Sequence, residues 1–199
     1  MSKKQILREW IALDVKPPLL KESREKNGGK LIISGVIQRA GVKNQNKRVY
    51  PRDVLVREME NYQKAIRENR AIGELDHPES STVSLSKVSH ILREAWWEGD
   101  DCYGRVEVLE RNSHGKELAA LLESGVTIGI SSRGVGSTAK MADGTDLVQD
   151  DYQLICYDIV SEPSTPGAYL FAEGKQIDTA PSFNKADRIW RVLNDITRK

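Results

Sequence analysis

The sequence has little of several features that mark whole classes of protein. Only two cysteines occur among its 199 residues, Cys102 and Cys156, without a C-x-x-C spacing. This argues against a disulfide framework or a thiolate zinc site and favours a reducing compartment. No apolar run approaches the roughly 20 residues of a membrane-spanning helix, and the first residues lack the apolar stretch of a signal peptide. A net charge of +1 gives no overall field toward nucleic acid or an anionic membrane, so we expect neither as a partner.

The chain divides into a body and two ends of different composition. Residues 1–29 contain Pro17-Pro18, a charged run and two adjacent glycines, which predict a flexible leader. Residues 30–172 hold most of the apolar and β-branched segments and form the predicted main domain. Residues 173–199 are expected to be a linker followed by an amphipathic helix.

Strand-like segments outnumber helical ones in the body. Residues 30–40 are β-branched and apolar, and residues 88–97 and 102–109 predict a β-hairpin. Residues 51–66 and 114–124 have the spacing of amphipathic helices. The mixture excludes a helix bundle and lacks the regular alternation of a doubly wound sheet. We therefore predict a β-rich α+β fold, a barrel or sandwich with a few surrounding helices.

The three histidines, His77, His90 and His114, are the first candidates for a base that works near neutral pH. His77 lies in GELDHPES, between an expected strand end and a turn at Pro78, where catalytic side chains are often displayed. A solvent-exposed turn histidine is the simpler alternative. His90 falls in a strand-like run and is expected to pack half-buried, whereas His114 begins a helix and is expected at the surface.

The segment IGISSRGVGS (128–137) is the candidate for a nucleophile. A nucleophilic serine needs an exposed hydroxyl on a rigid strand with backbone N–H donors nearby, which Arg133 and Gly134 would supply here. Ser-Ser-Arg-Gly is also ordinary turn chemistry. Strand alternation places Ser132 on the apolar face with Ile130 and Ser131 on the opposite face. This favours Ser131, unless a bulge precedes the pair.

A third residue should orient the imidazole and stabilise its charged form. Asp158 lies in the apolar stretch ICYDIV, where an acid is costly unless it is paired. Asp76 is adjacent to His77 but would project to the other side of an extended chain. Asp158 could also be an ordinary turn or edge aspartate, and His90 is a further alternative for the third residue.

Five segments, in order, resemble the prohead core proteases of T4-like phages, a family of serine peptidases. They are NKRVYP (46–51), GELDHP (73–78), Trp96-Trp97 with YGRVEVLE (103–110), GISSRGVGS (129–137) and DIVSEPSTPGA (158–168). The resemblance extends over most of the chain and makes residues 30–172 a protease domain. It implies a closed or partly open β-barrel surrounded by a few helices, as in herpesvirus assembly proteases.

The resemblance also implies roles for the candidate residues. His77 would be the general base, Ser131 the nucleophile, with Ser132 left open, and Asp158 the third member. Members of the family cleave after glutamate in Leu/Ile-x-Glu sequences. A cation in the protease would stabilise the glutamate that precedes the cleaved bond, and Arg133, Arg48 or Lys47 could provide it.

The implied substrates are phage scaffold and core proteins, the major capsid protein precursor and the chain itself. The implied place of action is the assembling prohead in the host cytoplasm, and no cofactor is implied. Leu7-Arg8-Glu9 and Leu20-Lys21-Glu22 are expected self-cleavage sites, because both fall in the predicted leader. A homo-oligomer is left open, since the C-terminal helix could pair with a second chain.

Two other functions compete with this interpretation. A metal-dependent hydrolase would use Glu74, Asp76, His77 and His90, but this cluster has no H-E-x-x-H spacing. A non-enzymatic scaffold or capsid-associated protein would use the Ser-Arg-Gly segment only as a turn.

Overall fold

A computed structural model describes residues 5–13, 17–78, 80–161 and 170–172. In chain order its elements are β1 (Gln5–Leu13), α1 (Pro17–Lys26), β2 (Ile32–Arg39), β3 (Arg48–Val49), α2 (Arg52–Arg67), β4 (Ile72–Glu74), the 3-10 turn η1 (Leu85–Lys87), β5 (Val88–Glu98), β6 (Asp101–Val108), α3 (Ser113–Glu123), β7 (Ile128–Gly136), β8 (Thr138–Lys140), β9 (Asp146–Val148), β10 (Gln153–Val160) and β11 (Leu170–Ala172). The predicted β-rich α+β class is confirmed.

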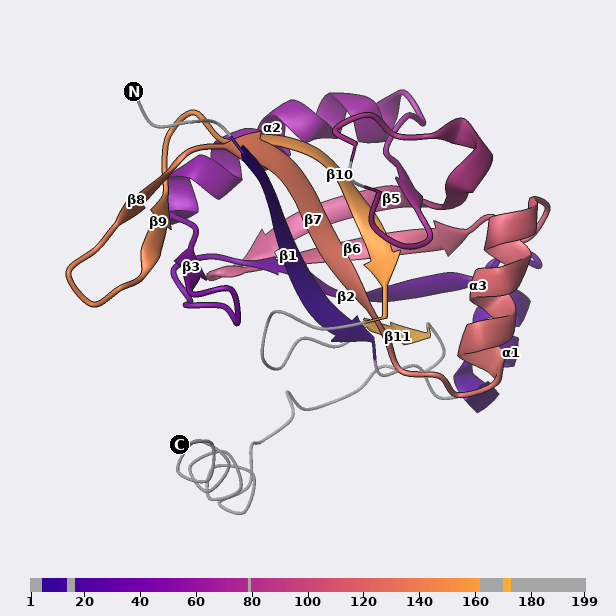
Figure 1. The fold of residues 1–199 in the computed structure, drawn as a ribbon. Coiled ribbons are helices and arrows are strands. Elements are labelled where there is room, and N and C mark those ends of the chain that lie inside the picture. Colours follow the sequence, from indigo (N-terminus) through magenta and orange to yellow (C-terminus); the bar gives the residue numbers. More distant parts are fainter. Residues whose placement is uncertain (1–4, 14–16, 79, 162–169, 173–199) are drawn as a thin grey trace, which may run out of the picture.

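The strands form three open sheets, with the orders β1-β7-β10, β11-β2-β6-β5-β4 and β3-β9-β8. The first sheet crosses in front of the second in Figure 1. A single parallel bridge between Leu75 and Ile159 joins their edges. No sheet closes on itself within the described ranges. Of the closed or partly open barrel that the resemblance implied, the closed form is therefore wrong.

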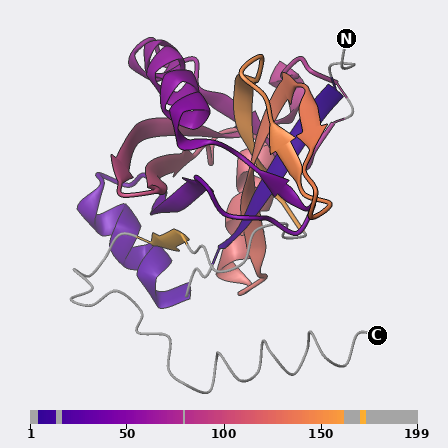
Figure 2. The ribbon, with the colours of Figure 1, turned by 90° about the vertical axis from the view of Figure 1, so that its left-hand side faces the viewer.

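The main core lies between the two larger sheets. Ile33 and Val106 come from the second sheet, Ile130 and Ile159 from the first, and all four are fully buried. Apolar burial of this kind is the main stabilising term of a domain. The helices close the open ends of this two-layer core. Helix α2 lies at one side, and α1 and α3 pack together at the other (Figures 1 and 2).

Helix α2 follows the pattern expected of an amphipathic helix. Leu55, Met59, Tyr62 and Ile66 recur on one face and are all buried. The predicted hairpin is also present, because β5 and β6 pair up to Glu98 and Asp101. None of the helices in the described part of the chain is long and apolar enough to cross a membrane.

The N-terminal segment differs from the flexible leader predicted for residues 1–29. Strand β1 pairs with β7 over its whole length, from Gln5 opposite Gly136 to Leu13 opposite Ile128. Helix α1 starts at Pro17, because proline at a first helical turn loses no hydrogen bond. The charged run thus belongs to a helix and not to a linker. The predicted linker and helix of residues 173–199 lie outside the described residues.

Candidate active site

The candidate site lies on one face of the β1-β7-β10 sheet. Ser131 is in the middle of β7, and Asp158 is directly opposite on β10. His77 comes from the turn after β4. That turn is held against β10 by a hydrogen bond from the backbone N–H of Asp76 to the Ile159 carbonyl, at 2.7 Å. The structure therefore brings together the three residues that the sequence assigned as nucleophile, base and acid.

Both imidazole nitrogens of His77 have partners. Nε2 is 2.7 Å from Ser131 Oγ, and Nδ1 is 2.9 Å from Asp158 Oδ2. An ionised carboxylate can only accept, so Nδ1 donates its proton to Asp158. Nε2 is then left to accept the hydroxyl proton of Ser131. This is the order of contacts that an activated serine requires.

A β-bulge in β10 places Asp158 on the same face as Ser131. The pairing of β10 with β7 shifts by one residue between Leu154 and Cys156. With regular pairing, Tyr157 would lie opposite Ser131, and Asp158 would lie opposite Ile130 in the core. Side chains directly opposite on antiparallel strands share a face. The bulge therefore decides whether the acid reaches His77.

The alternation argument for Ser131 agrees with the geometry. Pairing of β1 with β7 is regular across the serine pair. Ile130 is buried in the main core, and Ser131 points to His77 on the other side. Ser132 is also buried, and its hydroxyl has no hydrogen-bond partner among the described residues. Of the two serines, only Ser131 contacts an imidazole.

The position of His77 depends on an unusual backbone at Asp76. Asp76 has a φ of 70°, in the left-handed region that aspartate tolerates better than most residues. Its carboxylate accepts the backbone N–H of His77 at 2.8 Å. Asp76 therefore shapes the turn through the backbone of His77, whereas the ring nitrogens bond Ser131 and Asp158.

Arg133 lies two residues after Ser131 and on the same face of β7. Its side chain is fully buried. Nε donates to Asp158 Oδ2 at 2.8 Å, and Nη2 donates to Asp158 Oδ1 and Glu74 Oε1, each at 3.2 Å. Nη1 donates to the Ser80 carbonyl at 2.6 Å. The fork of the guanidinium thus binds both oxygens of the acid.

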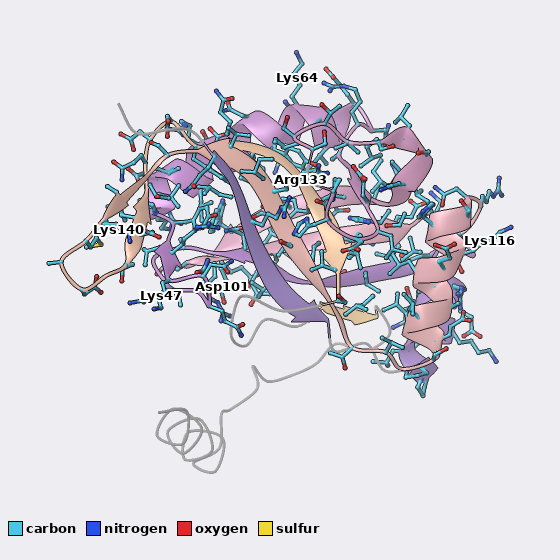
Figure 3. All side chains as sticks on the ribbon, in the orientation of Figure 1. Lys47, Lys64, Asp101, Lys116, Arg133 and Lys140 are labelled. Carbon is cyan, nitrogen blue, oxygen red and sulfur yellow. The ribbon has the colours of Figure 1, made fainter. Side chains whose placement is uncertain are left out.

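This placement differs from the substrate-binding role predicted for Arg133 and Gly134. The Arg133 guanidinium is enclosed by carboxylates, whereas the labelled lysines Lys47, Lys116 and Lys140 point outward (Figure 3). Gly134 is buried between β1 and β10, and a Cβ there would lie 2.4 Å from the Tyr152 ring. The Arg133 guanidinium is therefore not placed to meet the acid of a substrate. The predicted oxyanion donors, the backbone N–H groups of Arg133 and Gly134, belong to a strand that is paired on both sides.

The environment of Asp158 favours its charged form. Burial alone would raise the pKa of this carboxyl group. Hydrogen bonds from His77 and from the backbone N–H of Glu74, together with the Arg133 charge, outweigh burial and hold the pKa below its usual value. Asp158 is therefore ionised at neutral pH, as an acid that orients an imidazolium must be.

Sequence reasoning did not assign a role to Glu74 beyond a metal ligand. Its side chain is fully buried, and Oε1 accepts from Arg133 and from the backbone N–H of Ser84, the latter at 2.8 Å. Glu74 thus shares Arg133 with Asp158. The available signal was an acid inside a short strand, where burial without a cation would be costly.

The other predicted residues lie apart from His77. His90 is fully buried, with Nδ1 2.9 Å from Ser89 Oγ and Nε2 3.0 Å from the Tyr157 carbonyl. Burial lowers the pKa of His90 to about 4 despite the nearby Asp158 charge. His114 lies in the first turn of α3 and is partly buried, whereas the sequence predicted a surface position. Within the described ranges, no cluster of three or more His, Cys, Asp or Glu side chains is arranged to hold a metal ion.

Known proteins resemble this chain in sequence and in fold. The family model described as prohead core protein serine protease matches residues 10–179. The prohead core protein protease of Enterobacteria phage T4 is 34% identical over 173 residues, covering 85% of this chain and 82% of that protein. The solved structure of the bacteriophage T4 capsid assembly protease, gp21, matches with a TM-score of 0.69 at 28% identity, covering 81% of this chain and 99% of that chain. This chain belongs to the prohead core protein serine protease family.

Proposed function

We propose that this peptidase is a serine endopeptidase with Ser131 as nucleophile, His77 as general base and Asp158 as the acid that orients His77. The observation that carries the proposal is the unbroken series of hydrogen bonds from Ser131 Oγ through both nitrogens of His77 to Asp158. The alternative nucleophile Ser132 has no hydrogen bond to a base among the described residues. The alternative third residue His90 bonds Ser89 and the Tyr157 carbonyl instead of His77.

The proposed reaction proceeds through an acyl-enzyme. Ser131 Oγ attacks the peptide carbonyl carbon while His77 Nε2 takes the hydroxyl proton. His77 returns that proton to the leaving amine as the C–N bond breaks, leaving the acyl group on Ser131. A water molecule, deprotonated by His77, then attacks the ester, and the proton returns to Ser131 Oγ. Asp158 stabilises the positive imidazole in both halves.

Arg133 and Glu74 support this site without contacting the substrate. Arg133 holds both carboxylate oxygens of Asp158 and so fixes the plane of the carboxyl group. The backbone N–H of Glu74 donates to Asp158 Oδ1 at 3.0 Å, and its side chain accepts a hydrogen bond from Arg133 Nη2 and so helps to hold the guanidinium in place. Both are positioning residues, because they act on the substrate only through Asp158 and His77. Their effect on the rate can still be large, since a misplacement of a catalytic group by about 1 Å can cost on the order of 100-fold.

The substrates proposed for this chain are phage scaffold and core proteins and the precursor of the major capsid protein. The support is the name of the T4 relative, a capsid assembly protease. The place of action would be the assembling prohead within the host cell. We further propose cleavage after glutamate in Leu/Ile-x-Glu sequences. The two joined sheets, bridged by Leu75 and Ile159, are what would correspond to the partly open barrel of herpesvirus-like proteases.

Self-cleavage stays part of the proposal, but its predicted sites have a different setting. Leu7-Arg8-Glu9 lies in β1, and Leu20-Lys21-Glu22 lies in α1. A protease binds its substrate as an extended chain, so either element would first have to open. We therefore expect trimming at these sites from incompletely folded molecules. Mass spectra of wild-type and S131A chains, taken through refolding, would detect it.

The test of the serine mechanism uses four full-length chains: wild type, S131A, S132A and H77A. The S131A chain, partly unfolded in mild urea, also serves as the protein substrate. We expect wild type and S132A to cleave it with a chelator present, and S131A and H77A not to cleave it. Cleavage by S131A would show that the serine assignment is wrong. Loss of cleavage in the chelator would support the metal-dependent alternative.

A further inference from the structure

Two arginines from adjacent strands hold the loop that follows His77. Arg8 of β1 is paired directly with Arg133 of β7. Arg8 Nη2 donates to the Pro78 carbonyl at 2.7 Å, and Arg133 Nη1 donates to the Ser80 carbonyl at 2.6 Å. The N-terminal strand therefore reaches the turn that carries the base, although it lies about 70 residues away in sequence.

We propose that Arg8 is a positioning residue for His77, and that β1 is for this reason a working part of the active site. The inference rests on the proposed function of His77. On its N-terminal side the turn is fixed by the bond from Asp76 to Ile159. On its C-terminal side Pro78, the next residue after His77, is held by Arg8. The imidazole thus lies between two anchored peptide groups.

Strand β1 is rigid enough for this role. Leu7 is fully buried in an apolar cluster separate from the main core, together with Tyr50, Val54 and Tyr152. The Arg8 carbonyl accepts hydrogen bonds from Asn46 Nδ2 at 3.1 Å and Arg48 Nη1 at 3.4 Å. A side chain attached to so fixed a backbone can hold a neighbouring loop, because little entropy remains to be lost on forming the bond.

Packing alone does not account for an arginine at this position. Arg8 Nε is buried, and it has no hydrogen-bond partner within the part of the chain that the structure describes. A buried donor without a partner costs free energy that an apolar side chain of equal length would not. A residue with a purely structural role would therefore be replaceable by methionine. Methionine, however, cannot donate a hydrogen bond to the Pro78 carbonyl.

The consequence is a link between self-cleavage and activity. Cleavage after Glu9 would separate Arg8 from the rest of the chain and release its hold on Pro78. Trimming at Leu7-Arg8-Glu9 would then switch the protease off, whereas trimming at Glu22 alone would cut the covalent link but leave β1 paired with β7. The position of the first cut would decide whether the enzyme continues to work.

The test compares the reaction of a fluorophosphonate with Ser131 in full-length wild type, R8M, R8K, R105M and S131A. This probe needs an activated serine but no matching peptide sequence. We expect R8M to react roughly 10- to 100-fold more slowly with little loss of stability in urea. R8K keeps a donor of similar reach and should recover most of the rate. R105M, which removes an arginine paired with exposed Glu94 far from the site, should react like wild type.

A second readout follows the base itself. The chain has three histidines, so imidazole signals of ¹⁵N-labelled protein can be assigned by substitution. In R8M we expect the His77 signals to move and those of His90 and His114 to stay. An R8M chain that reacts at the wild-type rate or faster, or that fails to fold, would overturn the role of Arg8. Labelling of S131A would instead overturn the proposed function, whatever Arg8 does.

Discussion

Replacement of Arg133 by methionine should destabilise the protein strongly at neutral pH. The side chain joins two carboxylates, Asp158 and Glu74, and all three side chains are fully buried. Methionine keeps most of the volume but leaves two negative charges in a site that water does not reach. Breaking a buried ion pair by removing one partner costs about 3–5 kcal/mol. We expect a loss in that range in the free energy of unfolding of R133M.

The assay is urea unfolding at pH 7, with E74Q and the double variant E74Q/R133M measured alongside. Neutralising Glu74 removes one of the stranded charges, so the double variant should be more stable than R133M alone. The two substitutions are therefore not additive. A loss below about 1 kcal/mol for R133M, the value of an exposed pair, would show that Arg133 does not hold two buried charges. An additive double variant would refute the shared role of Arg133.

The pH dependence of unfolding in R133M tests whether ionised Asp158 stabilises or destabilises the fold without Arg133. In wild type the pKa of Asp158 is held below its unfolded value, so its ionisation stabilises the fold above an unfolded pKa of about 3.9. That stability is lost as the pH falls through the lower folded pKa. Without Arg133 the folded pKa of Asp158 rises, so its ionisation no longer stabilises the fold, and protonation at low pH removes a stranded charge. The stability difference between wild type and R133M should therefore be largest at pH 7 and narrow toward pH 3, which unfolding midpoints across this range would measure.

The remaining predictions concern residues around the triad. The contribution of His90 to stability should fall by about 2–3 kcal/mol as the pH drops from 6.5 to 4, because this buried residue has a pKa of about 4 and binds its proton mainly in the unfolded state; urea unfolding should show a steeper pH dependence in wild type than in H90Q. G73A should fail to fold or unfold at far lower urea, because its Cβ would lie 1.9 Å from the Tyr157 carbonyl. S132A should keep its stability within about 1 kcal/mol, because the Ser132 hydroxyl has no partner among the described residues, and circular dichroism during heating would measure it.

The residues of the proposed triad carry local signals that made them candidates, and the resemblance to prohead core proteases then gave them their expected roles. His77 precedes a proline in a turn, and Ser131 falls on the side of its strand away from Ile130. Side chains alternate between the two faces of any regular strand, so the face of Ser131 can be predicted without knowing the tertiary contacts. Ser131, His77 and Asp158 accordingly meet within hydrogen-bonding distance.

The features that sequence reasoning missed depend on contacts between distant segments. The bulge before Cys156 sets which side Asp158 faces, and no local pattern announces it. The polar leader folds as β1 and α1 because β7 and the core supply partners that composition cannot reveal. The burial of Arg133 could not be expected from a Ser-Arg-Gly sequence that also suits an exposed turn. Glu74 is its second partner, from a strand about 60 residues earlier.

Whether His77 activates Ser131 can be measured by locating the adduct of a fluorophosphonate on the full-length chain. We expect a single modified peptide with the label on Ser131, a rate that depends on His77, and no label in S131A or H77A. Unchanged labelling of S132A would complete the agreement. A label on Ser132, or labelling that continues in H77A at the wild-type rate, would contradict the proposal that His77 activates Ser131.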